Sequence, residues 1–189
     1  MRASSRRQVF LGLFVLAGAL GAWAYWLSLV PATHPDHDHG ILNLDAGGRL
    51  IAVARDGSKR NLVGKPGHVL VIHFFSTGAP DAAAELADLL AVQGTMKDDR
   101  GVEFVLLAKD RDFTTLDGWL KDKNLVPPVP LSLYLDPAGD TTQKLNSKRP
   151  VETMIFNAEG KLASQARGRM NWGTAEARIA SARGGETIE

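Results

Sequence analysis

An uncharged run from Val9 to Val30 constrains this chain more than any other feature of its sequence. As a helix, the run would span roughly 33 Å, about the thickness of the hydrocarbon core of a bilayer. Three arginines precede it, and the acidic residues Asp36 and Asp38 follow it. Under the positive-inside rule, this asymmetry places residues 1–8 in the cytoplasm. The sequence therefore predicts a single-pass anchor at residues 9–30 in the inner (cytoplasmic) membrane of a bacterium, with the rest of the chain in the periplasm.

Aromatic residues near the outer end of this run indicate a retained anchor. Trp23, Tyr25 and Trp26 fit the aromatic belt of a membrane interface. The apolar region of a cleaved signal peptide is normally shorter than this one. The pair Arg6-Arg7 also permits a twin-arginine export signal, although the apolar pair that should follow lies one position late.

The composition of the remaining chain sets few limits on its partners. The 189 residues leave room for one domain of roughly 150 residues after the anchor. Lys and Arg total 22 against 21 Asp and Glu, a net charge of +1, so no overall field selects nucleic acid. We therefore expect no nucleic-acid partner. The chain has no cysteine, which removes disulfides and thiolate metal sites.

Strand and helix patterns alternate after a polar, Pro-containing linker at residues 31–40. We expect strands at residues 41–45, 50–55, 68–75, 102–108, 131–135, 153–157 and 162–167. We expect helices at residues 81–96, 113–123 and 174–182, with Pro80 opening the first and Thr114 or Thr115 capping the second. Turn signals at residues 46–48, 136–139 and 158–160 separate neighbouring strands. The run at residues 68–75 is apolar enough to be buried on both faces of a sheet, so it should be the central strand.

Several segments of this region match one protein family. They are the segment from His73 to Glu85, Gly64-Lys65-Pro66, the stretch from Leu135 to Gly139, and the stretch from Arg149 to Lys161. On these segments, residues 42–182 resemble the membrane-anchored thioredoxin-like proteins of the TlpA/ResA class. The resemblance implies an α/β, thioredoxin-like fold, with a central mixed sheet flanked by helices. We expect this domain at residues 41–183 and a C-terminal tail at residues 184–189.

The reactive residues of that family are absent from this chain. A gapless alignment places its two active-site cysteines at Ala79 and Ala82, and its glutamate at Glu85. The tryptophan before the first cysteine is replaced by Gly78. Thiol-disulfide exchange needs a thiolate nucleophile and a resolving thiol, and alanine supplies neither. The sequence therefore favours a non-catalytic domain without a cofactor.

The family's substrate groove does not depend on sulfur. The resemblance implies that Pro150 takes the place of the proline whose cis peptide bond faces the cysteine pair. The loop before that proline pairs its backbone groups with an extended segment, a form of strand addition. Trp172 either lines this region or belongs to the core. The resemblance thus implies a protein-binding groove made of Gly78, Ala79, Pro80, Asp81, Arg149 and Pro150.

Two other sets of polar residues allow a chemical role and a structural one. His73 lies inside the central strand, where we expect a buried neutral imidazole with a backbone partner rather than a catalytic base. Asp81 and Glu85 are four residues apart on one helix and could form an acid–base pair. Acidic residues are also favoured in a first helical turn by the helix dipole, and we adopt that explanation.

The linker carries a possible metal-binding cluster. His34, His37 and His39 lie beside Asp36 and Asp38, and imidazole and carboxylate groups bind Zn²⁺ or Cu²⁺. A Pro-Asp linker offers no second shell to hold such ligands, so the sequence favours a solvated linker and no metal site.

Three functions follow from these observations. The favoured one is a redox-inactive periplasmic domain that acts as a protein-binding accessory or assembly subunit, with a membrane protein complex or a periplasmic protein as its partner. The first alternative is a thiol-disulfide oxidoreductase for cytochrome or oxidase maturation, which requires cysteines at positions 79 and 82 in the native gene. The second is copper or zinc delivery through the linker histidines.

Overall fold

The computed structural model describes residues 50–62, 64–125 and 132–184, all within a unit that runs from Ile41 to Glu189. The predicted anchor at residues 9–30, the linker at 31–40, the strand at 41–45 and most of the tail lie outside the described residues. Within the ranges that the structure describes, none of the helices combines the length and apolar character that a membrane crossing requires.

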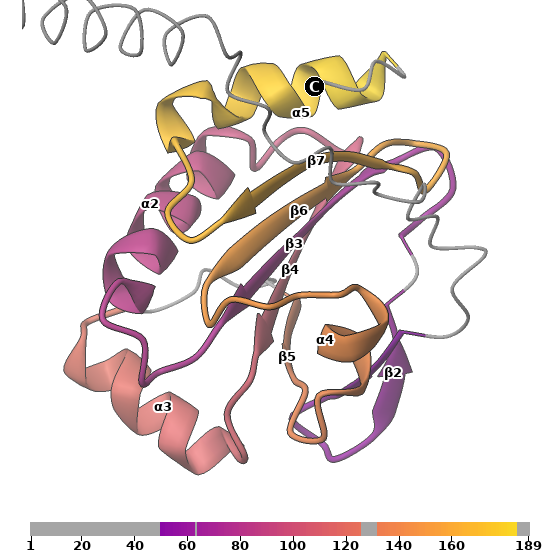
Figure 1. Cartoon of the computed structure of the whole chain (residues 1–189). Helices are drawn as coiled ribbons and strands as arrows, with labels where there is room; N and C mark the ends of the chain where they lie inside the picture. Colours follow the sequence, from indigo (N-terminus) through magenta and orange to yellow (C-terminus); the bar gives the residue numbers. More distant parts are fainter. Residues whose placement is uncertain (1–49, 63, 126–131, 185–189) are drawn as a thin grey trace, which may run out of the picture. The chain divides into compact units, whose positions relative to one another are not determined.

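The domain is built on one mixed sheet of seven strands in the order β2-β1-β5-β4-β3-β6-β7 (Figure 1). Strands β3, β4 and β5 run parallel to one another, whereas β6, β7, β1 and β2 join in antiparallel pairs. The strands are β1 (Ile51–Val53), β2 (Lys59–Asn61), β3 (Val69–Phe75), β4 (Val102–Ala108), β5 (Ser132–Leu135), β6 (Glu152–Phe156) and β7 (Leu162–Arg167).

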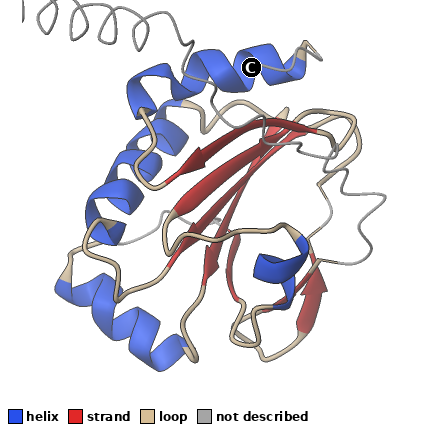
Figure 2. Cartoon of the chain, viewed as in Figure 1, coloured by secondary structure: helices blue, strands red, loops and turns tan. Residues whose placement is uncertain are grey.

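Helices cover both faces of this sheet (Figure 2). The helices are α2 (Ala82–Thr95), α3 (Phe113–Asp122), α4 (Asp140–Lys144) and α5 (Ala175–Arg183), with a 3₁₀ turn, η1, at Trp172–Thr174. The units β3-α2-β4 and β4-α3-β5 both step along the sheet in one direction, so right-handed crossovers place α2 and α3 on the same face. The short α4 lies on the other face. The mixed sheet with flanking helices confirms the predicted α/β class.

Strand β3 is the centre of the sheet, as its apolar sequence predicted. All seven of its residues are buried, and it pairs with β4 and β6 along its length. Alternate side chains enter two apolar clusters, because successive residues of a strand point to opposite faces. Val71 and Phe75 join the cluster of α2, α3 and α5, while Ile72 and Phe74 join the cluster that contains Leu145 after α4.

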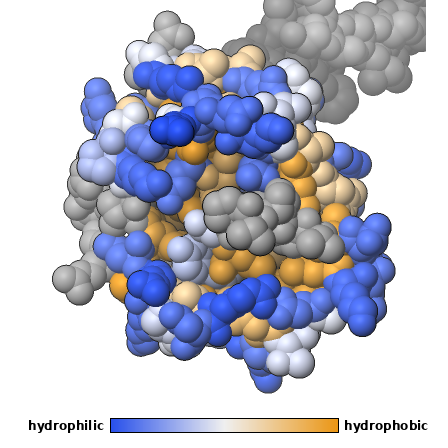
Figure 3. All heavy atoms as spheres, turned by 180° about the vertical axis from the view of Figure 1, so that it is seen from behind, coloured by the Kyte–Doolittle hydropathy of each residue, from blue (hydrophilic) through white to orange (hydrophobic). Residues whose placement is uncertain are grey.

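The side of the molecule opposite to Figure 1 shows apolar side chains bordered by hydrophilic ones (Figure 3). Several apolar residues that pack against the cluster of α2, α3 and α5 are only partly buried, among them Leu90, Phe104 and Leu133.

Three local predictions were wrong or incomplete. Helix α3 is capped by Asp112, whose Oδ1 accepts a hydrogen bond from the N–H of Thr115 at 2.8 Å, and not by a threonine. The strand predicted at residues 50–55 is shorter, and a hairpin that was not predicted joins it, as β1, to β2. The hairpin turns through Gly57, which has a φ of +76°, a conformation that favours glycine. Helix α4 was not predicted, because its five residues carry only Thr141 as a buried side chain and so show no apolar period.

The edge strand β2 is short and charged. Its three residues are all exposed, and they include Lys59 and Arg60. Arg60 also pairs with Asp56 across the hairpin turn, at 3.5 Å.

Candidate functional site

Two segments predicted to form a groove leave the sheet at the same edge. Parallel β3 and β4 end together at Phe75 and Ala108, and antiparallel β6 begins opposite them, with Glu152 paired to Phe74. The segment that follows β3 and the segment that precedes β6 are therefore neighbours. The topology thus brings residues 76–81 and residues 149–151 to one edge.

The two alanines at the cysteine positions differ in exposure. Ala82 is the first residue of α2 and is fully buried. Ala79 is partly buried against the main core cluster. Gly78, Pro80 and Asp81 lie toward the surface, and both Pro80 and Asp81 border the start of α2. Asp81 occupies the N-cap position of α2, but its side chain makes no capping hydrogen bond.

The segment after β3 is fixed by a carboxylate from the neighbouring strand end. Thr77 donates from its N–H to Asp110 Oδ2 at 3.2 Å and from its Oγ1 to Asp110 Oδ1 at 2.5 Å. Asp110 follows β4, so these bonds join the ends of the two parallel strands. The Thr77 hydroxyl is thus a hydrogen-bond donor to Asp110. Among the described residues, no histidine side chain forms a hydrogen bond with this hydroxyl, because His73 pairs with Thr153 instead.

Lys109 holds the other segment. Its ammonium group donates to the carbonyl of Arg149 at 2.5 Å and to Ser147 Oγ at 2.9 Å. It also lies 5.3 Å from the centre of the Phe74 ring. Burial lowers the pKa of Lys109, and the nearby charges of Glu152 and Asp136 act against that shift. Lys109 thereby fixes the position of the Arg149 carbonyl.

Part of the backbone before β6 remains open. The carbonyl of Val151 accepts from the N–H of Gly168, and the carbonyl of Arg149 is occupied by Lys109. No described residue accepts from the N–H of Arg149 or Val151, or donates to the carbonyl of Pro150. Arg149 and Pro150 are exposed, whereas Val151 is 3% exposed. The exposed groups, which are the N–H of Arg149 and the carbonyl of Pro150, can pair with a segment of another chain.

Glu152 is a fully buried carboxylate directly behind this loop. It accepts from the N–H of Lys148 at 3.1 Å and from Gln165 Nε2 at 2.5 Å, and Arg167 Nε lies 3.4 Å away. A buried carboxylate needs such partners to offset its lost hydration. Glu152 therefore ties the start of β6 to β7.

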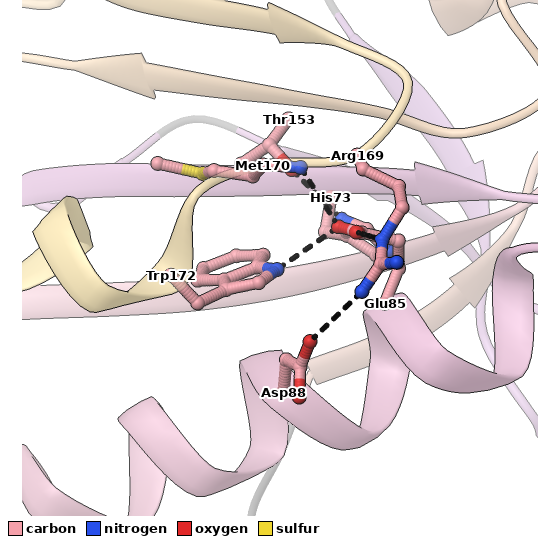
Figure 4. A network of polar contacts seen from close by, with 7 residues as sticks. All are labelled: His73, Glu85, Asp88, Thr153, Arg169, Met170 and Trp172. Carbon is pink, nitrogen blue, oxygen red and sulfur yellow. Dashed lines mark hydrogen bonds and ion pairs between the residues drawn. The ribbon is translucent and has the colours of Figure 1, made fainter.

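Glu85 is the second fully buried carboxylate, on the inner face of α2 (Figure 4). Its Oε2 accepts from Trp172 Nε1 at 2.9 Å and from the N–H of Met170 at 3.1 Å, and its Oε1 accepts from Arg169 Nε at 3.2 Å. Arg169 also lies 3.7 Å from Asp88. The helix-dipole explanation for Glu85 is thus incomplete, because the carboxylate anchors the segment between β7 and η1. Asp81 is exposed and does not share this site.

His73 confirms the prediction of a buried neutral imidazole. Its Nδ1 lies 2.9 Å from Thr153 Oγ1, so its partner is a side-chain hydroxyl rather than the expected backbone group. Burial lowers the pKa of His73 to about 3, and its Nε2 has no hydrogen-bond partner among the described residues. Its ring packs near Phe75 and Trp172, at centroid distances of 6.0 and 6.1 Å. Trp172 is 7% exposed, so it belongs to the core.

Sequence reasoning missed three side chains that fix these segments: Lys109, Glu152 and Arg169. Lys109 follows directly on a predicted strand end, so its position at this edge could have been inferred. An open groove of about 470 Å³ lies beside Arg169 and was also not predicted; it is lined by Asp88, Ala91, Val92, Arg169, Met170, Asn171, Trp172 and Gly173. No cluster that could hold a metal ion occurs in the described part of the chain, and His34, His37 and His39 lie outside that part.

Neither a family model nor a curated protein matches this sequence, but solved structures match its fold. MTB DsbF, in its mixed oxidized and reduced forms, is 17% identical over 72% of this chain and 97% of its own, with a TM-score of 0.62. A putative thiol:disulfide interchange protein DsbE from Chlorobium tepidum is 18% identical over 72% and 94%, with a TM-score of 0.61. StoA from Bacillus subtilis is 14% identical over 70% and 96%, with a TM-score of 0.57. The described domain therefore has a thioredoxin-like fold.

Proposed function

We propose that this domain is redox-inactive and binds an extended segment of another protein, as an accessory or assembly subunit of a membrane protein complex. One observation carries the proposal. Exposed, unpaired backbone groups of Arg149 and Pro150 lie at the same end of the sheet as Ala79 and Ala82, in a chain without cysteine.

The absence of thiols supports a non-catalytic role. The solved structures with this fold include proteins named for thiol-disulfide interchange, a reaction that requires two sulfur atoms. Here the two corresponding positions carry methyl groups. The domain retains the fold and lacks the nucleophile.

The local geometry supports binding by strand addition. An extended segment pairs through its own N–H and C=O groups, so it needs a backbone that is exposed and unpaired. The N–H of Arg149 and the carbonyl of Pro150 meet this requirement. The Lys109 ammonium group keeps the loop in place from the inner side. The loop before β6 is thus held in place before a partner binds, which reduces the entropy that binding would cost.

The predicted anchor supports a partner at the membrane. A tether confines the domain near the bilayer surface and raises its effective concentration toward other proteins there. This part of the proposal depends on residues 9–30, whose role is a prediction from sequence.

Site-specific photocrosslinking in the native membrane tests the proposal. A photoreactive benzoylphenylalanine replaces Asp81 or Arg149 at the proposed groove, or Glu159, an exposed control in the turn at the opposite end of β6. We expect one defined adduct from positions 81 and 149 and none from position 159. Equal adducts from all three positions, or none from positions 81 and 149, would overturn the proposal.

The oxidoreductase alternative is favoured by the names of the structural neighbours alone. It requires cysteine codons at positions 79 and 82 of the native gene, so sequencing genomic DNA decides between the two functions. Alanine codons there would exclude thiol chemistry by this chain.

A further inference from the structure

We propose that the outer edge of β7 pairs with the same strand of a second copy of this chain, so that the two sheets join across a two-fold axis at Ala166. Strand β7 is the last strand of the sheet, at the far side from β2 (Figure 1). Its six residues carry one charged side chain, Arg167. This surface is separate from the loop before β6, which the proposed function uses.

The pairing of β7 with β6 determines which backbone groups of β7 are open. The N–H of Gly168 donates to the carbonyl of Val151 at the end of this pair of strands, at 2.9 Å. Residues that bond to the partner strand alternate with residues that do not, so Gln165 and Arg167 direct their N–H and C=O groups away from β6. No backbone group of another described residue bonds to these groups. The outer edge of β7 therefore offers four open backbone groups.

Strand β7 lacks the features that protect β2 from strand addition. A length of three residues and exposed charges discourage pairing at β2. On β7 the Arg167 guanidinium is instead paired within the domain, because its Nε lies 3.4 Å from the fully buried carboxylate of Glu152. The irregularity between β6 and β7 lies at Ile155 and Phe156, opposite the start of β7. The rest of β7 is regular and can extend the sheet.

A second copy fits this edge because one antiparallel register uses every open group on both chains. In that register Gln165 of each copy lies opposite Arg167 of the other, and the two pairs exchange four backbone hydrogen bonds. Ala166 lies opposite its own counterpart. Like charges directly opposite each other would destabilise the pair, but here a carboxamide faces each guanidinium. The edge is thus self-complementary, as a two-fold contact requires.

The contact is small, so it depends on a high local concentration. Two short strand edges bury less than the roughly 1,200 Å² at the lower limit of stable complexes. The anchor predicted at residues 9–30 would hold copies in one membrane and raise their effective concentration. We therefore expect pairing between copies that share a membrane.

Single cysteines provide the test, because the chain has none of its own. Ala166→Cys places two thiols opposite each other where the Cα atoms are about 4.5 Å apart, a distance that a disulfide can bridge. Ser164→Cys is the matched control, with similar burial on the same strand. In this register its counterpart lies four residues, or about 13 Å, away. Arg60→Cys is the control on the opposite edge strand β2, and each full-length chain is oxidised with copper phenanthroline in its native membrane.

Gln165→Pro, added to Ala166→Cys, tests the backbone pairing itself. Proline removes an outward N–H from each copy and is tolerated on an edge strand where that N–H faces solvent. Gln165→Ala is its control, because it keeps the N–H and also removes the side-chain bond to Glu152. We expect about tenfold less cross-linked dimer with proline than with alanine at position 165.

We expect a disulfide-linked homodimer from Ala166→Cys and from neither control. Equal yields at the three positions would indicate random collision, and the absence of a homodimer at position 166 would show that the strands do not pair; either result overturns the inference. A dimer at position 164 in place of 166 would contradict the register, and an adduct of position 166 with a different protein would assign β7 to another partner, so both overturn it as well.

Equal yields with proline and alanine at position 165 would exclude pairing through the backbone and would also overturn the inference. Each of these failures leaves the proposed function standing, because that function is tested at positions 81 and 149. If Ala166→Cys does not fold, co-expressed chains with Gln165→Cys and Arg167→Cys, which the register places opposite each other, repeat the test.

Discussion

The buried network around Glu85 and His73 and the exposed loop before β6 are organised in opposite ways. Glu85 and His73 are fully buried, and Glu85 accepts three hydrogen bonds from groups distant in sequence. The exposed edge contains the backbone N–H of Arg149 and the carbonyl of Pro150, which have no hydrogen-bond partner among the described residues. Buried polar groups must be satisfied to keep the domain folded, whereas exposed groups are satisfied by water or by a partner. We therefore expect stability to depend on the interior, and the proposed binding to depend on the edge.

The largest effect on stability should come from Glu85→Ala. It leaves the Trp172 indole N–H and the Met170 N–H buried without an acceptor, so we expect the free energy of unfolding to fall by about 3 kcal/mol. Urea denaturation followed by tryptophan fluorescence measures this. Glu85→Gln keeps one acceptor oxygen and should lose less. A loss below about 0.5 kcal/mol for Glu85→Ala, the range of a surface substitution, would contradict the assigned role of the interior.

The next largest effect should be a loss of stability in mild acid caused by His73. Its pKa is about 3 in the folded domain and about 6.5 when unfolded. Stability is therefore full above pH 6.5 and falls as the pH drops toward 3, because only the unfolded chain takes up the proton. Between pH 7.5 and 4.5 we expect a loss of just under about 3 kcal/mol from this group, with a limiting slope of about 1.4 kcal/mol per pH unit.

The variant His73→Phe isolates this contribution from other titrating groups. Its urea midpoint should change less with pH over the same range than that of the parent chain. Parallel pH profiles for the two proteins would show that His73 is not held neutral by burial.

Lys109→Met should have an intermediate effect on stability, because Lys109 is half-buried and bonds to the exposed loop before β6. The substitution removes two hydrogen bonds from a half-buried amine, so we expect a loss of about 1 kcal/mol. It should also reduce the photocrosslinked adduct at position 81, because the Arg149 carbonyl loses its hydrogen bond to Lys109. Thermal unfolding and the yield of the adduct measure the two effects. An unchanged yield would show that Lys109 does not support the proposed binding site.

The smallest effect on stability should come from the edge itself. Asp81→Ala and Arg149→Gln alter exposed side chains that make no hydrogen bond or ion pair with the rest of the described domain. Each should therefore change the free energy of unfolding by less than about 0.5 kcal/mol. Urea denaturation again provides the measurement. A loss comparable to that of Glu85→Ala would remove the distinction between interior and edge.

Local sequence pattern predicted much of the fold but little of the interior network. The strands at residues 102–108 and 162–167 were predicted with their observed bounds, because apolar runs between turn signals are local features. The network around Glu85 joins residues 84 to 87 positions apart, and such contacts leave no local signal. Helix α4 was missed because it is too short to show a period.

The candidate site was partly predictable, because the resemblance to a known family relates segments that are far apart in the sequence. The resemblance by itself implies that Ala79, Ala82 and the loop at Pro150 share one region, and the strand pairing brings these segments to one edge. The contributions of Lys109 and Glu152 depend on side chains from three strands meeting there. That arrangement follows from the topology rather than from any single segment.

The charged edge strand β2 bears on how crowded copies of this domain can behave. An open sheet edge offers unpaired N–H and C=O groups to any neighbouring strand, and short strands with charged side chains discourage such pairing. With Lys59 and Arg60 exposed on only three residues, copies of the domain that meet repel one another at this edge. Copies at high concentration should therefore not join through β2, whereas β7, the strand at the other edge of the sheet, has six residues and one charged side chain, Arg167.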